Sequence, residues 1–217
     1  MSLVFGRGIG GLTDDVLGDA ELVTFDVFDT LVRRSCGDPG SVFDLVERIA
    51  REEAPELCPT GFRHMREAAE CEARHAVGSG EEVTLAKIYE RLPLLAGVCE
   101  ELMELELACE LAVCEPNPKV VSRYDEIRAS RRVAIVSDMY LPEWAVAAIL
   151  DECGVYGYEE LFVSSRHGAM KRNGRLFKLV IDELRVDPND ALHVGDHPLA
   201  DWIAPQRLGM GAYLLSN

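Results

Sequence analysis

Short apolar runs and amphipathic stretches alternate along most of this chain. The runs whose length and β-branched content predict buried strands cover residues 22–25, 132–136, 161–164, 191–194 and 212–215. The stretches whose polar and apolar spacing predicts helices between the later strands cover residues 119–129, 142–153, 176–184 and 199–208. Strands that alternate with helices indicate an α/β fold with a doubly wound parallel sheet.

Residues 35–115 show a helical pattern only and separate the first predicted strand from the others. The helices expected there cover residues 42–50, 62–77, 84–92 and 98–114. This block is long for a crossover between two strands, and we interpret it as an inserted subdomain. The last of its helices carries five glutamates that we interpret as a solvated face: Glu100, Glu101, Glu104, Glu106 and Glu110.

The stretch Gly6-Arg7-Gly8-Ile9-Gly10-Gly11 has the glycine spacing of a dinucleotide-binding loop. Only Leu3 to Phe5 could form a preceding strand, and the sequence predicts no βαβ unit around it, so the context that this motif needs is missing. We therefore interpret this segment as a flexible leader.

Composition narrows the functional classes. With 217 residues, 48% hydrophobic residues and a net charge of −16, the chain can bury a full core, and its charge disfavours nucleic-acid and anionic-membrane partners. No apolar run is long enough to cross a bilayer. The seven cysteines include no Cys-x-x-Cys pair, and no secretory leader is evident, so we expect reduced thiols in the cytoplasm.

Polar residues follow four of the predicted strands. Asp26 ends the first strand, Ser137 ends the second, and Lys171 lies in the loop after the third. Asp196 and Asp201 follow the fourth strand, and Thr30 comes four residues after Asp26. Because the carboxyl ends of parallel strands meet at one edge of a sheet, we expect these groups to form one site there.

These residues resemble the four motifs of the haloacid dehalogenase superfamily. The motifs read Asp26-Val27-Phe28-Asp29-Thr30, then Ile135-Val136-Ser137, then Lys171, then Gly195-Asp196-His197-Pro198-Leu199-Ala200-Asp201. The resemblance implies a Rossmann-like sheet of order 5-4-1-2-3, a core of residues 1–34 and 116–217, and a helical cap of residues 35–115. The phrases Phe25-Asp26-Val27-Phe28-Asp29-Thr30-Leu31 and Ser137-Asp138-Met139-Tyr140-Leu141-Pro142 are similar to an uncharacterised "predicted hydrolase" branch of that superfamily.

The chemistry of phosphoryl transfer suits these residue types. Asp26 would attack phosphorus and form an aspartyl-phosphate, while Ser137 and Lys171 would hold the phosphoryl oxygens. The expected Mg²⁺ ligands are Asp26, the backbone carbonyl of Phe28, Asp196 and Asp201. The expected contacts to a small phosphorylated substrate are Thr30, Ser137, Asp138, Lys171 and Arg34. Other candidate anion contacts, for each of which we favour an ordinary surface ion pair, are Arg33, Arg63, His64, Arg66, Arg74 and His75.

Phe28 departs from the phosphatase pattern. Most phosphatases of the superfamily carry an acid two residues after the nucleophile, whereas haloacid dehalogenases carry an aromatic residue there. Asp196 favours a metal site, because an extra carboxylate beside Asp26 needs a cation to keep the nucleophile ionised. We therefore expect an Mg²⁺-dependent phosphatase. The alternatives are a metal-independent 2-haloacid dehalogenase-like hydrolase and a weakly catalytic protein that binds a phosphorylated ligand.

Overall fold

The computed structural model describes residues 4–5, 8–53, 55, 58–78 and 80–216. Six strands pair in parallel in one sheet of order β1-β8-β7-β2-β5-β6. The strands are β1 (Val4–Phe5), β2 (Leu22–Phe25), β5 (Arg132–Ser137), β6 (Leu161–Val163), β7 (Ala191–Gly195) and β8 (Gly211–Leu214). The five predicted strands thus appear in the order 5-4-1-2-3, and the predicted fold class is confirmed.

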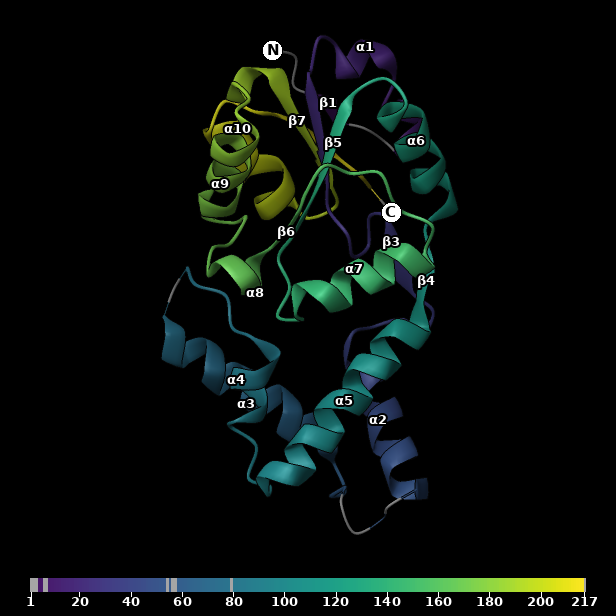
Figure 1. Ribbon diagram of the computed structural model, residues 1–217, viewed down its shortest axis with the longest axis vertical. Helices are drawn as coiled ribbons and strands as arrows, with labels where there is room; N and C mark the ends of the chain where they lie inside the picture. The colour runs from purple at the N-terminus through teal and green to yellow at the C-terminus, as the bar shows by residue number, and fades with distance from the viewer. Residues whose placement is uncertain (1–3, 6–7, 54, 56–57, 79, 217) are drawn as a thin grey trace.

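Helices cover both faces of this sheet (Figure 1). Helices α1 (Asp14–Leu17), α6 (Pro118–Arg128) and α7 (Glu143–Glu152) lie on one side, and α9 (Arg175–Leu184) and α10 (Ala204–Arg207) lie on the other. Side chains alternate between two apolar clusters along β5: Val133 and Ile135 belong to one, Ala134 and Val136 to the other. This two-residue period explains why the strand reads as continuously apolar in sequence.

A second group of helices lies beyond the carboxyl ends of the strands (Figure 1). It contains α2 (Gly40–Glu53), α3 (Phe62–Val77), α4 (Leu85–Tyr89) and α5 (Ala96–Val113). An antiparallel pair of short strands, β3 (Val32–Arg34) and β4 (Cys114–Pro116), links this group to the sheet. The four helices agree with those predicted between residues 35 and 115, although α4 is shorter than expected.

The acidic face predicted on α5 is only partly correct. Glu100, Glu101 and Glu104 are exposed, but Glu106 and Glu110 are 0% and 1% exposed. Both buried glutamates bind arginines. Glu106 receives two hydrogen bonds of 2.8 Å from Arg66, and Glu110 binds Arg34. The surface interpretation is therefore wrong for Glu106 and Glu110 and for Arg66, because α5 packs against α2, α4 and α7.

Other differences concern the ends of the chain. Leu3, Gly6 and Arg7 lie outside the described residues. Val4 and Phe5 pair with β8, and the Gly8 carbonyl accepts a hydrogen bond of 2.7 Å from the Tyr213 hydroxyl, so the described part of the leader is fixed to the sheet. The predicted helix at 199–208 is a π-helix, η3 (Pro198–Ile203), followed by α10, and an unpredicted helix, α8 (Ser164–His167), follows β6.

Among the described residues, no helix combines the length and the apolar character that crossing a bilayer requires.

Candidate active site

The predicted site residues lie where the central strands end. Asp26 directly follows β2, and its backbone N–H donates to the Val194 carbonyl of β7 at 2.9 Å. In the sheet register Phe25 stands opposite both Ile135 and Val194. Ser137 on β5 and Asp196 after β7 are therefore both two residues beyond the level at which β2 ends, and Asp26 is one residue beyond it, which places them beside Asp26.

Three carboxylates and one ammonium group form the centre of the site. Ligand oxygens of Asp26, Asp196 and Asp201 all lie within 4.8 Å of one another. The Lys171 ammonium donates to Asp26 Oδ1 and lies 2.7 Å from Asp201 Oδ1. Lys171 is 2% exposed and Asp26 is 6% exposed, so a single buried cation faces three acidic groups.

This imbalance shifts the pKa values of the groups in different directions. Burial raises the pKa of Asp26 to about 8, with Lys171 opposing the rise and Asp201 and Asp196 adding to it. Burial also raises the pKa of Asp196, and the nearby Asp201 and Asp29 add to that rise. For Asp201, burial is outweighed by Lys171 and His193, which together hold its pKa below the usual range. Without a further cation, Asp26 is thus largely protonated at neutral pH.

Asp201 is fixed by donors on both of its oxygens. Its Oδ1 accepts from Lys171 and lies 3.1 Å from His193 Nε2, and its Oδ2 accepts from the backbone N–H of His197 at 2.9 Å. A Cβ on Gly195 would stand 2.5 Å from Asp201 Cγ, so glycine is required for this approach. Asp201 lies within η3, and these donors hold its carboxylate in one orientation. A fixed carboxylate of this kind suits a group that orients ligands rather than one that moves.

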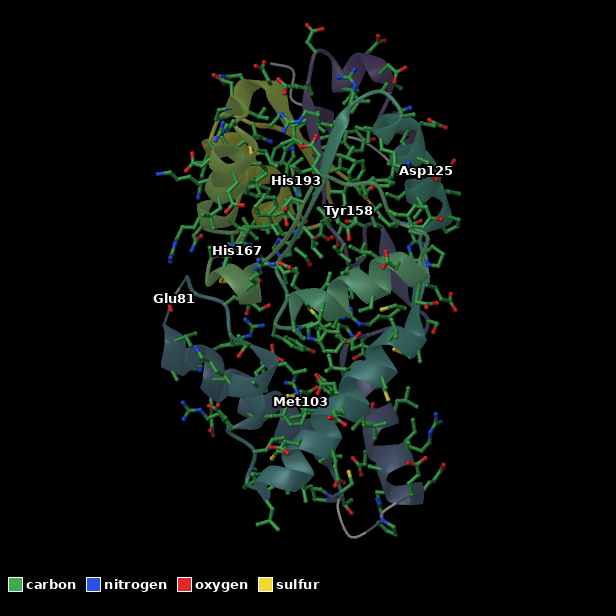
Figure 2. All side chains as sticks on the ribbon, viewed as in Figure 1. Glu81, Met103, Asp125, Tyr158, His167 and His193 are labelled. Atoms are coloured by element: carbon green, nitrogen blue, oxygen red, sulfur yellow. The ribbon has the colours of Figure 1, made fainter. Side chains whose placement is uncertain are left out.

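His193 supports Asp201 from inside the sheet, where Figure 2 shows it. It is fully buried, and its Nδ1 lies 2.7 Å from the Thr24 hydroxyl on β2. Burial lowers the pKa of His193, so the ring is neutral, with Nε2–H donating to Asp201 and Nδ1 accepting from Thr24. The sequence places His193 inside an apolar strand and assigns it no functional role. The signal that could have indicated its role is the pairing of two polar residues, His193 and Thr24, at the same level of two otherwise apolar strands.

Two buried hydroxyls in the first two motifs have no hydrogen-bond partner among the described residues. They are Thr30 Oγ1 and Ser137 Oγ, on side chains that are 0% and 1% exposed. The backbone around Thr30 is held by Asn117, whose side-chain amide donates to the Thr30 carbonyl at 2.9 Å. Unsatisfied buried donors are costly, so this pair fits a site that receives an oxygen-rich ligand.

Asp138 and Glu82 also contribute to the site. The Lys171 backbone N–H donates to Asp138 Oδ1 at 2.7 Å, so Asp138 holds the loop that carries the lysine. Glu82, between α3 and α4, is 5% exposed and accepts from the Ser164 hydroxyl at 3.2 Å. The same hydroxyl accepts from the backbone N–H of Met139 at 2.8 Å. Neither residue had a sequence signal, because Glu82 lies in an irregular segment and Ser164 begins the short helix α8, which the sequence did not predict.

Arg34 connects the first motif to the helical group. Its guanidinium lies 4.3 Å from the centre of the Phe28 ring and binds both oxygens of Glu110, at 2.9 and 3.2 Å. The aromatic residue at the position of the usual acid is therefore the platform for this arginine. The predicted contact of Arg34 with substrate remains a prediction.

The donor set fits Mg²⁺. Hard oxygen ligands from carboxylates are what this ion binds, and three carboxylates converge here with only one cation beside them. Asp26 and Asp196 would hold the ion, with Asp201 acting through water, and the Phe28 carbonyl is a further candidate ligand. Burial and the neighbouring Asp201 and Asp196 raise the pKa of Asp26, and a bound cation would favour its ionised form.

The model of the haloacid dehalogenase-like hydrolases matches residues 20–209 of the chain. The chain therefore belongs to this family and is a hydrolase by family. No curated protein matches it in sequence.

Solved structures share its fold at low identity. A 2-haloacid dehalogenase from Pseudomonas syringae pv. Tomato DC3000 is 20% identical over 88% of this chain and 84% of its own, with a TM-score of 0.66. The L-2-haloacid dehalogenase from Xanthobacter autotrophicus is 18% identical over 88% and 75%, with a TM-score of 0.58. The enzyme bt-2542 from Bacteroides thetaiotaomicron, in complex with magnesium and inorganic phosphate, is 13% identical over 90% and 93%, with a TM-score of 0.58.

Proposed function

We propose that the protein is an Mg²⁺-dependent phosphatase that hydrolyses a small phosphorylated metabolite through an aspartyl-phosphate. The observation that carries this proposal is the convergence of Asp26, Asp196 and Asp201 within 4.8 Å of one another around Lys171. A metal-independent reaction at carbon gains nothing from the extra carboxylate of Asp196, which would disfavour the ionised form of Asp26. Hydrolysis of a phosphoryl dianion with the help of a divalent cation does use this carboxylate, because the carboxylate would bind the cation.

In the proposed reaction, a carboxylate oxygen of Asp26 attacks phosphorus, and the bond from phosphorus to the alcohol oxygen breaks. Water then hydrolyses the acyl phosphate, which releases inorganic phosphate and restores Asp26. Lys171 faces Asp26 and would offset charge on the nucleophile and the phosphoryl group. The free hydroxyls of Ser137 and Thr30 would donate to phosphoryl oxygens.

The same arrangement assigns roles to the remaining predicted residues. Asp26, Asp196 and the Phe28 carbonyl would hold Mg²⁺, and Asp201, whose oxygens already accept from protein donors, would act through water. When bound, the ion would neutralise the negative charge of the phosphoryl group and favour the ionised form of Asp26. Asp138 and Arg34 border the same cavity and would contact the substrate.

The alternative reaction, metal-independent dehalogenation of a 2-haloacid, is favoured by Phe28 and by the dehalogenases among the similar structures. A catalytically weak protein that binds a phosphorylated ligand is a further alternative. The magnesium and phosphate complex of bt-2542 supports the phosphatase reading by analogy of fold.

A direct assay separates the three. Purified protein should hydrolyse aryl phosphates with Mg²⁺, lose activity with a chelator and regain it with added Mg²⁺. Asp26→Asn should lower kcat by at least about 10³-fold while the fold persists. Release of halide from a 2-haloacid in the presence of chelator would overturn the proposal in favour of dehalogenation. Absence of turnover, with phosphate binding retained, would favour the ligand-binding protein.

We further propose that residues 35–115 act as a cap that selects substrate over a core of residues 1–34 and 116–217, as the separation in Figure 1 supports. We also propose membership of the "predicted hydrolase" branch, on the phrases 25–31 and 137–142. A cytoplasmic location, with no nucleic-acid or membrane partner, is supported by the seven free cysteines and the net charge of −16.

A further inference from the structure

A cavity of about 630 Å³ lies between the first two motifs and the helices α2 and α3. Its charged lining residues are Asp29, Arg34, Glu67, Glu70, Arg74 and Asp138. Two of these neighbour a buried hydroxyl without a partner, since Asp29 precedes Thr30 and Asp138 follows Ser137. The cavity therefore adjoins the place proposed for the phosphoryl group, and the rest of the substrate would occupy it.

Both arginines of the lining are already engaged. Arg34 binds both oxygens of Glu110. Arg74 donates to Glu70 at 2.8 Å and to Glu82 at 2.5 Å. Each guanidinium charge is thus offset before a substrate enters, and neither is a ready partner for a second anionic group on a substrate.

The carboxylates of the lining are less well offset. Asp29 makes no side-chain hydrogen bond or ion pair with the described residues, and Asp138 uses one oxygen on a backbone N–H. Glu67 binds Arg63, which also binds Asp38 at 3.0 Å and Asp44 at 2.8 Å. The single guanidinium of Arg63 therefore pairs with three carboxylates, those of Glu67, Asp38 and Asp44. The surplus charge of the cavity is negative.

We propose that the alcohol portion of the substrate carries a positive charge, as an amino alcohol does, and that esters with a carboxylate or second phosphate on that portion are poor substrates. This inference rests on the proposed phosphatase function. An ammonium group in the cavity would gain from Asp29 and the free oxygen of Asp138, whereas an anion would meet them without an available counter-ion. The cavity charge also disfavours 2-haloacids, which are carboxylates.

The test uses aryl phosphates that differ in charge but keep similar leaving groups. They are the phosphates of 4-(aminomethyl)phenol, 4-(hydroxymethyl)phenol and 4-(carboxymethyl)phenol. With saturating Mg²⁺, kcat/KM should fall in that order, by about tenfold or more from the first to the last. A flat or reversed order with good turnover would overturn the inference and leave the phosphatase proposal standing. Failure to hydrolyse any of the three would overturn both.

Charge-neutral variants locate the effect. Asp29→Asn suits the site, because Asp29 has φ of 60° and asparagine adopts this left-handed conformation readily. It should reduce the ratio of kcat/KM for the aminomethyl ester to that for the carboxymethyl ester severalfold, with Glu67→Gln acting in the same direction. The control is Glu52→Gln, an exposed residue of α2 outside the cavity lining, which should leave the ratio unchanged. An equal change in the control would show a general charge effect and overturn the assignment to the cavity.

Discussion

Phe28 is the residue that sets this chain apart from the phosphatase pattern. Its ring supports Arg34, which Glu110 fixes in place, so an acid at this position would lose the stacked guanidinium. The structure thus gives the aromatic residue a positioning role. In the proposed phosphatase reaction, the leaving group would have no proton donor at this position.

The first prediction follows from that missing acid. An alcohol that must depart without a proton leaves more slowly as its pKa rises. We expect kcat/KM to fall steeply across a series from nitrophenyl to alkyl phosphates, because general acid catalysis is worth about 10² to 10⁴ in rate. Phe28→Asp should flatten the dependence. A shallow dependence in the unmodified protein would show that another group, such as Asp29 or Asp138 at the cavity, already supplies the proton.

Asp26 provides the second prediction, on metal binding and pH. Its pKa is raised from 3.8 to about 8 without metal, so from pH 4 to 8 the folded, metal-free protein binds a proton that the unfolded chain has released. This group alone therefore makes the free energy of unfolding fall as pH rises through that range. Binding of Mg²⁺ requires the carboxylate, so its affinity should rise about tenfold per pH unit and level off above about pH 8.

Calorimetric titration with Mg²⁺ at several pH values, in buffers of different ionisation enthalpy, measures the affinity for Mg²⁺ and the number of protons released on binding. Near pH 7 we expect about one proton to be released per ion bound. In Asp26→Asn the proton release should disappear. An affinity that does not change between pH 6 and 8 would contradict the assignment of Asp26 as a metal ligand.

At the scale of elements, sequence pattern was sufficient for the regular parts. Strand 132–136 and helix 62–77 could be placed because an apolar run or a repeating face marks each directly. The meeting of Asp26, Ser137 and Asp196 also followed from parallel strands ending at one edge. No such rule places Glu82, whose position depends on how an irregular loop packs against Ser164.

The buried charges of α5 show the same limit. Glu106 and Glu110 follow the pattern of a polar helix face, and only the tertiary packing of α3 and β3 brings Arg66 and Arg34 against them. From the sequence alone, each arginine and each glutamate can be assigned to its own element, but the contact between them cannot be predicted. The first strand, β1, was missed for a related reason, since a run of two residues carries no pattern.

The third prediction tests these buried pairs. Arg66 is 0% exposed, binds Glu106 and lies 4.9 Å from the centre of the Tyr140 ring, so its loss leaves a buried carboxylate without its counter-ion. Arg66→Ala should lower the free energy of unfolding by about 3–5 kcal/mol, measured by urea denaturation. Arg63→Ala, which breaks only surface pairs, should lower the free energy of unfolding far less. Equal losses would contradict the distinction between the two arginines.

At the scale of the whole molecule, the apolar core is continuous from the sheet into the helical group. One cluster contains Val23 and Phe25 of β2, Tyr140 of the second motif, and Leu102 and Cys109 of α5. The helical group and the sheet share this cluster, and the ion pair of Arg34 with Glu110 also joins the two. The site is therefore framed by both parts of the chain.

The net charge of −16 gives the last prediction. A phosphate monoester is a dianion at pH 7 and is repelled by such a protein, even though Lys171 and a bound cation attract it locally. The Debye length falls from about 30 Å at 0.01 M salt to about 8 Å at 0.15 M, so added salt screens the long-range repulsion more than the short-range attraction. At saturating Mg²⁺, kcat/KM for phenyl phosphate should rise severalfold over this range with little change in kcat. The phosphate of 4-(aminomethyl)phenol, with one fewer net negative charge, should show a smaller rise. A kcat/KM that falls with added salt would mean that the local positive charge, and not the field of the whole molecule, governs substrate capture.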